Sequence, residues 1–192
     1  MLTRRAALGL LAASCLPVHA ETDPLAGRFG GPFTLQTGGG RRVSDTDFRG
    51  KFMLVYFGYT HCPDICPEDL VIINDALNLL GRDADRVQPL FITVDPARDT
   101  PELMQDYVSS ISPRLIGLSG SEAEIAALAK AYRVHRVKLA PAAAAKDQDN
   151  YIVDHSSLKY LMGPDGQFRT LVPHSVSAAR MAEIIAGYLA KA

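Results

Sequence analysis

Short, continuous apolar runs are the first feature of this chain. The run KFMLVYFGY at 51–59 and a second run at 87–94 lack the alternation of polar and apolar positions. Strands buried on both faces show this pattern, so both runs predict central strands of a sheet. A shorter run at 115–118 predicts a third strand, and the residues near Phe33 predict a short strand ahead of the others.

Four further segments have apolar residues at helical spacing. The first covers 67–80 and stops at Gly81, and the others begin after Thr100, after Ser121 and after Ser177, which are capping residues. Ser121 and Glu124 also form the pattern of a capping box. The four apolar stripes are Leu70, Ile73, Leu77 and Leu80; Leu103, Tyr107 and Ile111; Ile125, Leu128 and Tyr132; and Met181, Ile184, Ile185 and Leu189.

The segment 134–151 interrupts this alternation of strands and helices. It contains Pro141, four consecutive alanines and the polar stretch KDQDN, which together predict a long surface loop. The segments 157–162 and 167–171 then predict two strands joined by the turn sequence GPDG at 163–166. Alternating strands and helices, followed by a hairpin and a helix, indicate an α/β fold with a mixed sheet flanked by helices.

The first 20 residues have the order of a secretory signal. Arg4 and Arg5 precede an apolar run at 6–16, and small residues lead to Ala20, where we expect cleavage. The apolar run is shorter than the roughly 20 residues that span a bilayer. A twin-arginine signal and lipid attachment at Cys15 remain weaker alternatives. We therefore expect an exported, periplasmic protein whose single domain covers 21–192.

Charge excludes one class of partner. Loss of Arg4 and Arg5 leaves 18 of the 20 basic residues against 21 acidic ones. A protein that binds nucleic acid would present a basic face, so we expect no nucleic-acid partner.

Cleavage would leave Cys62 and Cys66 as the cysteines of the mature chain. The sequence FGYTHCPDICPEDL at 57–70 places both where a strand passes into a helix. A helix N-terminus stabilises a thiolate, so this pair can cycle between dithiol and disulfide or bind a soft metal. A purely structural disulfide is less favoured, because closing so short a loop contributes little to stability.

A metal site would need a third ligand, and the mature chain offers four histidines. We expect His61 to point away from the cysteines, His135 to lie on the surface, and His174 to sit in a loop without an obvious partner. His155, in the sequence Asp154-His155-Ser156, immediately precedes a predicted strand, and a loop at that end of the sheet can reach the cysteine turn.

Three separated segments carry a family resemblance. The sequences FGYTHCPDICPEDL at 57–70, TVDPARDTPE at 93–102 and YIVDHSSLKYLMGPDGQF at 151–168 together resemble the Sco/SenC family. The resemblance implies a thioredoxin-like fold and a copper chaperone that helps to assemble the binuclear copper centre of cytochrome c oxidase. It also implies that copper is bound by both motif cysteines and the motif histidine, here Cys62, Cys66 and His155.

Ligand chemistry agrees with that implied set. Cu(I) is soft and favours thiolates, and an imidazole can complete a trigonal site. Cu(II) would need a further ligand such as water or Asp64, and zinc is compatible with the same donors. We expect Asp154 to orient the site, and Asp95 and Pro96 to support it without acting as ligands.

The resemblance also implies partners. These are a copper-receiving subunit of cytochrome c oxidase or another periplasmic copper chaperone, with membrane contact through the partner or an N-terminal anchor. Family members are commonly tethered by an uncleaved helix, whereas this N-terminus has the order of a cleavable signal.

A second hypothesis is a thiol–disulfide oxidoreductase in which Cys62 and Cys66 act on cysteines of a copper-receiving partner. Redox thioredoxins usually space their cysteines by two residues and carry a proline before the facing strand. The spacing of three, and Asp154-His155 at the comparable place, favour metal binding. A peroxidase, suggested faintly by Thr60 and Cys62, fits less well.

Overall fold

The computed structural model describes residues 27–140 and 151–192, so the predicted signal at 1–20 and the alanine run lie outside the described residues. Within the described ranges the chain forms nine strands and four α-helices. The strands are β1 (Thr34–Gln36), β2 (Arg42–Ser44), β3 (Phe52–Gly58), β4 (Val87–Thr93), β5 (Ile116–Leu118), β6 (Arg136–Leu139), β7 (Ile152–His155), β8 (Lys159–Met162) and β9 (Phe168–Val172). The helices are α1 (Ile65–Leu80), α2 (Pro101–Ser109), α3 (Glu122–Tyr132) and α4 (Ala178–Leu189).

Five strands form the central sheet, in the order β5-β4-β3-β8-β9. The first three are parallel, and β8 and β9 add to them antiparallel. Every residue of β3 is buried, which confirms that the apolar run at 51–59 forms a central strand. The hairpin turn at 163–166 is also confirmed, since the Gly163 N–H donates to the Gln167 carbonyl at 2.7 Å and Gly166 has a φ of 77°.

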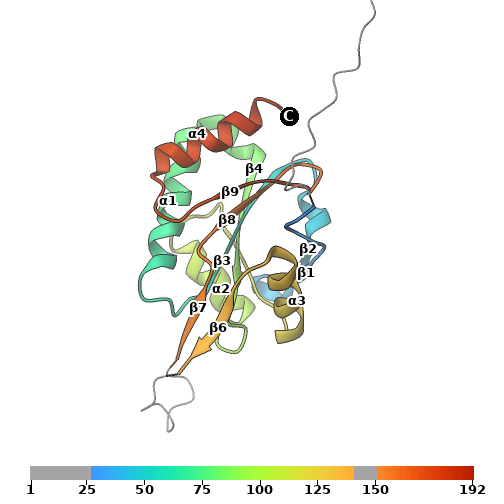
Figure 1. Cartoon of the computed structure of the whole chain (residues 1–192), viewed down its shortest axis with the longest axis vertical. Coiled ribbons are helices and arrows are strands. Elements are labelled where there is room, and N and C mark those ends of the chain that lie inside the picture. The colour runs from blue at the N-terminus through green and yellow to red at the C-terminus, as the bar shows by residue number, and fades with distance from the viewer. Residues whose placement is uncertain (1–26, 141–150) are drawn as a thin grey trace, which may run out of the picture.

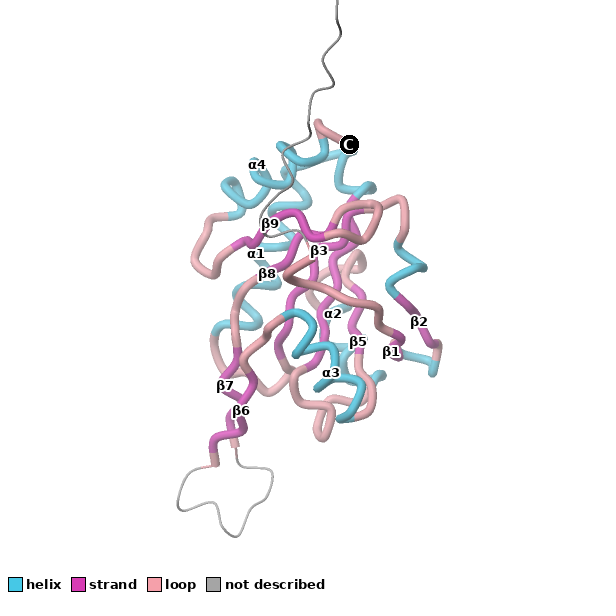
Figure 2. The backbone as a smooth tube through the Cα atoms, turned by 45° about the vertical axis from the view of Figure 1, so that its right-hand side comes forward, coloured by secondary structure: helices cyan, strands magenta, loops and turns pink. Residues whose placement is uncertain are grey.

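Two layers cover the sheet (Figure 1). One face carries Tyr56 and Phe91, whose ring centroids are 5.6 Å apart, and it packs against α1 and α2. The opposite face carries Phe57 and Tyr160, and both rings contact Tyr132 of α3. The view in Figure 2 places β1 and β2 on the α3 side and α4 beside α1. This mixed sheet between helices confirms the predicted α/β fold, with its C-terminal hairpin and helix.

Two predicted helices differ in detail from the structure. The first begins at Ile65 instead of 67, so Cys66 lies within its first turn and not in the preceding loop. In α2 the buried residues are Met104 and Val108, whereas Leu103 is 40 % exposed. The reason is the close approach of α2 to β5, where a Cβ on Gly117 would lie 2.4 Å from the Met104 carbonyl oxygen. That contact turns the Met104 side of the helix inward.

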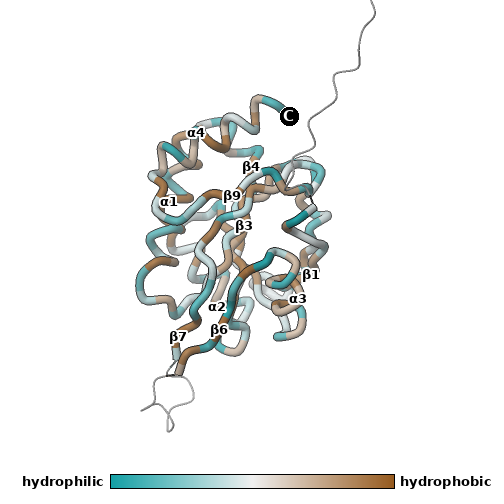
Figure 3. Tube along the Cα trace, in the orientation of Figure 1, coloured by the Kyte–Doolittle hydropathy of each residue, from teal (hydrophilic) through white to brown (hydrophobic). Residues whose placement is uncertain are grey.

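The expected loop at 134–151 is wrong near its start, because β6 lies there and pairs with β7, which follows the loop, as an antiparallel ribbon. The ribbon projects from one end of the sheet in Figures 1 and 2. Its outer face carries Val137, Leu139 and Ile152, which are 42 %, 45 % and 52 % exposed. Figure 3 shows this hydrophobic colour at the tip as well as along the central strands. Val137 and Leu139 do alternate with polar residues, but the pattern covers only four positions and is followed by Pro141 and the alanine run, so the segment was assigned to a loop.

Candidate metal centre

The two cysteines lie where β3 passes into α1, as the sequence predicts. The Cys62 N–H donates to the Tyr59 carbonyl at 3.3 Å, which closes the turn that carries Cys62. The Cys66 N–H in turn points at the Cys62 sulfur, 3.5 Å away. Cys66 is fully buried and Cys62 is half-buried, and both are free cysteines. The start of α1 therefore places one sulfur at the surface and the other beneath it.

Gly58, the last residue of β3, makes room for the buried sulfur. A Cβ at this position would lie 2.8 Å from the Cys66 sulfur and 2.5 Å from the ring of Phe91. Real carbon contacts are not this short, so any larger residue would displace one of these groups. The glycine allows Cys66 to pack directly on the sheet.

Asp99 holds the cysteine turn from the neighbouring loop. Its buried carboxylate accepts hydrogen bonds from the Thr60 hydroxyl at 2.6 Å, from the Thr60 N–H and from the Thr93 hydroxyl at 2.7 Å. These bonds link the end of β4 to the turn that precedes Cys62. Asp99 belongs to the segment 93–102, which the sequence marked only through the family resemblance.

His155, at the end of β7, is brought to the same place. Its Nε2 lies 3.7 Å from the Cys66 sulfur, and its Nδ1 lies 3.0 Å from the Val153 carbonyl oxygen. A carbonyl can only accept, so Nδ1 carries the proton that is donated to it. The lone pair of the neutral ring is then on Nε2, which faces the cysteines. This is the tautomer that a metal-binding histidine needs.

Tyr59 attaches the β7 strand to the end of β3. Its hydroxyl accepts a hydrogen bond from the Val153 N–H at 3.2 Å. Its ring meets the His155 imidazole edge to face, with centroids 5.6 Å apart and planes at 81°. Tyr59 therefore positions the β7 backbone at Val153 and also packs against the ring of His155.

A second attachment lies immediately before β7, two residues from the first. The Tyr151 hydroxyl donates to the buried Asp95 carboxylate at 2.7 Å, and the Arg98 guanidinium lies 3.7 Å above the Tyr151 ring. Burial alone would raise the pKa of Asp95, but the hydrogen bonds from Tyr151 and Arg98 outweigh it, so the pKa is lowered. Asp95 thus has the supporting role that the sequence predicts.

The pKa values of the two thiols are shifted in opposite directions. The hydrogen bond from the Cys66 thiol, with the N–H groups at the start of α1, lowers the pKa of Cys62 to about 5. The same hydrogen bond and burial raise the pKa of Cys66. The pair therefore holds one proton at neutral pH, with the thiolate at Cys62 and the thiol at Cys66.

The structure places the three predicted ligands side by side without a finished coordination shell. In residues 27–140 and 151–192, no group of three His, Cys, Asp or Glu side chains is already arranged to hold a metal ion. Small side-chain shifts at Cys62 and His155, both partly exposed, would be needed to bring all three donors to one point.

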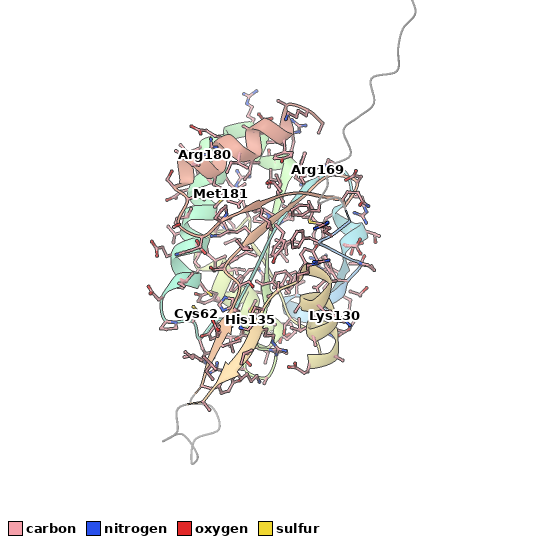
Figure 4. All side chains as sticks on the ribbon, in the orientation of Figure 1. Cys62, Lys130, His135, Arg169, Arg180 and Met181 are labelled. Carbon is pink, nitrogen blue, oxygen red and sulfur yellow. The ribbon has the colours of Figure 1, made fainter. Side chains whose placement is uncertain are left out.

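Other predicted residues fall outside this group. Asp64 is exposed at the start of α1. Asp154 contacts His135 at 3.2 Å on the outer face of the ribbon, so the Val153 carbonyl orients His155 instead. Figure 4 shows Cys62 and His135 at the ribbon end of the molecule. The side chain of His61 is half-exposed and lies 3.0 Å from the Thr60 hydroxyl.

His174 has a partner that the sequence did not reveal, since its Nδ1 lies 3.3 Å from both carboxyl oxygens of the buried Asp69. Tyr59 and Lys159 are two further residues near the site that were not predicted from the sequence. A lysine inside an apolar strand is the signal that could have drawn attention to Lys159. Within the described part of the chain no helix is long and apolar enough to cross a membrane.

Comparison with known proteins gives one consistent result. A family model described as SCO1/SenC matches residues 21–190. The mitochondrial SCO1 homologue of Mus musculus is 43% identical over 162 residues, which cover 83% of this chain and 56% of the relative. The chain thus spans about half the length of the curated relatives it matches.

Solved structures agree with the sequence comparison. ScoI of Bradyrhizobium japonicum, solved with copper bound, is 44% identical, with a TM-score of 0.75 over 83% of this chain and 99% of that one. BsSco, in which a disulfide switch was identified, is a member of the Sco family of cytochrome c oxidase assembly proteins. It is 25% identical, with a TM-score of 0.66 over 88% of this chain and 95% of that one.

Proposed function

This chain belongs to the SCO1/SenC family, and we propose that it binds copper through Cys62, Cys66 and His155 and takes part in the assembly of cytochrome c oxidase. The observation that carries the proposal is the approach of the His155 Nε2 to within 3.7 Å of the Cys66 sulfur, beside Cys62. Copper bound to a similar Sco protein supports the choice of metal.

The donor set suits Cu(I) as the cargo. Two thiolates and one imidazole form a soft, three-coordinate site, and Cu(I) accepts such a geometry readily. The low pKa of Cys62 supplies one thiolate at neutral pH, and the free lone pair of His155 supplies the nitrogen. The remaining proton, on Cys66, leaves when copper enters, so binding weakens as the pH falls.

Unequal exposure of the ligands suggests how copper is passed on. Cys66 is fully buried, whereas Cys62 and His155 are partly exposed. Donor atoms of a recipient therefore reach copper from the Cys62 and His155 side, and Cys66 is the last ligand to be exchanged. The recipient that we propose is a copper-receiving subunit of cytochrome c oxidase or another copper chaperone.

The signal order at 1–20 supports a periplasmic location for a mature domain at 21–192. Bacterial relatives of known structure are compatible with such a location. Mass spectrometry of the exported chain tests this, because a mature protein that begins at Glu21 is expected and an intact N-terminus would contradict cleavage.

The alternative is a thiol–disulfide oxidoreductase that reduces cysteines on the copper-receiving partner. One observation favours it. The lowered pKa of Cys62 and the burial of Cys66 fit an attacking thiolate with a protected resolving thiol.

Anaerobic Cu(I) titration of the reduced chain tests the proposal, with a competing Cu(I) chelator as the readout. We expect one tightly bound Cu(I) per chain, and a loss in Cys62→Ala, Cys66→Ala and His155→Ala larger than the roughly 10- to 100-fold that outer partners of a metal site contribute. His135→Ala is the matched control, because His135 is exposed on the outer face of the ribbon and should keep wild-type affinity. Full affinity in His155→Ala, with thiol exchange intact, would favour the oxidoreductase.

A further inference from the structure

A buried polar cluster lies directly behind Cys66. It consists of Tyr56, Asp69 and Lys159, and we call it the inner polar cluster. Tyr56 and Lys159 are cross-strand partners on β3 and β8, so their side chains leave the sheet on the same face. Asp69 follows Cys66 by three residues on α1, which places both on one side of that helix. The strand pairing and the helix spacing thus bring the cluster against the buried cysteine.

The contacts within the inner polar cluster are close. Lys159 and Asp69 form an ion pair, and both side chains are fully buried. The Lys159 ammonium lies 5.1 Å from the centroid of the Tyr56 ring. His174 contacts Asp69 from the outer side and is 36% exposed. The Lys159–Asp69 ion pair therefore has His174 as its polar neighbour towards solvent and Tyr56 as its polar neighbour towards the cysteine site.

The Tyr56 hydroxyl is the member closest to the metal centre. It is buried and lies beside the Cys66 thiol and the Asp69 carboxylate. It completes a regular hydrogen bond with no residue in the part of the chain that the structure describes. Its O–H group faces two acceptors, the Asp69 carboxylate and the Cys66 sulfur, so it can turn to the sulfur when that sulfur becomes negatively charged.

Stability alone does not account for this arrangement. A buried ion pair is usually no more stabilising than apolar residues of the same volume, and a buried hydroxyl whose hydrogen bonds are irregular is less favourable than an apolar group. The surroundings are apolar, since Leu70, Ile73 and Phe91 are all fully buried. Polar groups in such a position stabilise charge that arises beside them.

We propose that the inner polar cluster is a buried electrostatic support for the Cys66 sulfur. Lys159 supplies positive charge, and Tyr56 donates a hydrogen bond, when that sulfur becomes negatively charged as a ligand. Cu(I) with two thiolates and a neutral imidazole has a net charge of about −1, which a buried site must balance. Asp69 has the opposite effect on the sulfur, but it keeps the lysine in place. The three are positioning residues that act through Cys66.

One consequence does not depend on copper. Reduction of a Cys62–Cys66 disulfide by a dithiol breaks the S–S bond and forms another in the reductant. Two electrons and one proton pass to the protein and the second proton of the dithiol goes to solvent, so the reduced pair carries a thiolate that the neutral disulfide lacks. A positive group beside the pair favours the reduced state, and a negative group favours the disulfide.

The test is a redox titration of the metal-free chain against dithiothreitol, with free thiols counted by alkylation and mass spectrometry. We expect Lys159→Met to make the disulfide about tenfold harder to reduce, because a nearby charge shifts a proton equilibrium by roughly one to three units. Asp69→Asn should change the equilibrium in the opposite direction. A merely structural role would lower the melting temperature of both variants without giving shifts of opposite sign.

Tyr56→Phe covers the case in which the charge variants fail to fold. It removes the donor without leaving a charge unpaired, so it should fold and should also make the disulfide harder to reduce. Lys191→Met, which removes an exposed lysine at the C-terminus, is the matched control and should leave the equilibrium unchanged. An unchanged equilibrium in Tyr56→Phe, or shifts of the same sign in Lys159→Met and Asp69→Asn, would overturn the proposal.

Cu(I) affinity is a second readout, and only this part rests on the proposed function. Lys159→Met should bind Cu(I) about tenfold more weakly than the wild type, within the range found for outer partners of metal sites. Shifts of opposite sign in a chain that binds no Cu(I) would leave the inner polar cluster established and the copper proposal wrong. Tight Cu(I) binding by the wild type without those redox shifts would support the copper proposal and overturn the role of the inner polar cluster.

Discussion

At the scale of single residues, Cys62 and Cys66 differ although they are separated by only three positions. Cys62 is half-buried and accepts hydrogen bonds from the Cys66 thiol and from the start of α1. Cys66 donates that hydrogen bond and has no exposed surface. Cys62 is therefore the reactive thiolate of the pair, and Cys66 is a thiol protected by burial.

This difference predicts a specific pH profile for alkylation. The thiolate of Cys62 forms as the pH rises through about 5, so its modification by iodoacetamide should reach a plateau well below pH 8. An ordinary exposed cysteine has a pKa of about 8.5. Peptide mass spectrometry after short pulses at each pH measures the profile, and Cys66 should remain unmodified in the folded chain.

Cys66→Ser provides the internal comparison for that experiment. A serine hydroxyl is a poorer match for the buried position and for the long contact to sulfur, so the midpoint for Cys62 should move towards higher pH. A wild-type midpoint near 8.5 would show that the hydrogen bond from Cys66 does not stabilise the thiolate.

At the scale of elements, the junction of β3 with α1 depends on a close approach of helix and sheet. Gly58 contributes no side chain at the point where the Cys66 sulfur and the Phe91 ring meet the strand. Thr60, bonded to Asp99, fixes the turn that follows. The position of the buried sulfur is therefore set by packing, in addition to the helix N-terminus.

Gly58→Ala should consequently disturb both stability and the metal centre. The added methyl group overpacks the contact, for which about 1–3 kcal/mol of destabilisation is typical. Equilibrium unfolding in urea measures this, and Cu(I) affinity should fall in the same variant. Gly187→Ala is the matched control, because Gly187 lies in α4 with nothing within 4 Å of the added carbon. That change should stabilise the helix by up to about 1 kcal/mol. Equal stability of the Gly58→Ala and wild-type chains would contradict the packing argument.

The elements also show what could be predicted from the sequence. Continuous apolar runs and capping residues are local signals, so β3, β4 and the start of α3 at Ser121 were predicted correctly. The β6–β7 ribbon was missed because each of its strands is only four residues long and β6 is followed by Pro141 and the alanine run, which favour a loop. The contact between Lys159 and Asp69 was also missed, since a pair of this kind exists only after α1 packs on the sheet.

At the scale of the whole molecule, the candidate site is assembled from two distant parts of the chain. Cys66 and His155 are 89 positions apart, and His155 arrives on a ribbon that projects from the body. Tyr59 and Tyr151 attach the start of β7 to the body through hydrogen bonds with Val153 and Asp95. Arg136 attaches β6 through the Val94 carbonyl and Glu122. Local sequence patterns identified the cysteines, whereas His155 needed the family resemblance, because only the folded sheet brings the two parts together.

A ligand shared by both parts should therefore restrain the ribbon. Without copper, the β6–β7 ladder can open locally at low cost, since it is two-stranded and its outer face is exposed. Cu(I) bound to Cys66 and His155 would link β7 to α1, so opening would also require loss of a metal ligand.

Hydrogen exchange followed by mass spectrometry should show slower exchange over 136–139 and 152–155 with Cu(I) than without it. The β8–β9 hairpin, which already belongs to the five-stranded sheet, should change less. In His155→Ala, at Cu(I) concentrations high enough to offset its weaker binding, the ribbon should lose this protection, because the two remaining thiolates hold copper on the α1 side alone. Equal slowing throughout the wild-type chain would instead indicate global stabilisation by copper without a link between ribbon and body.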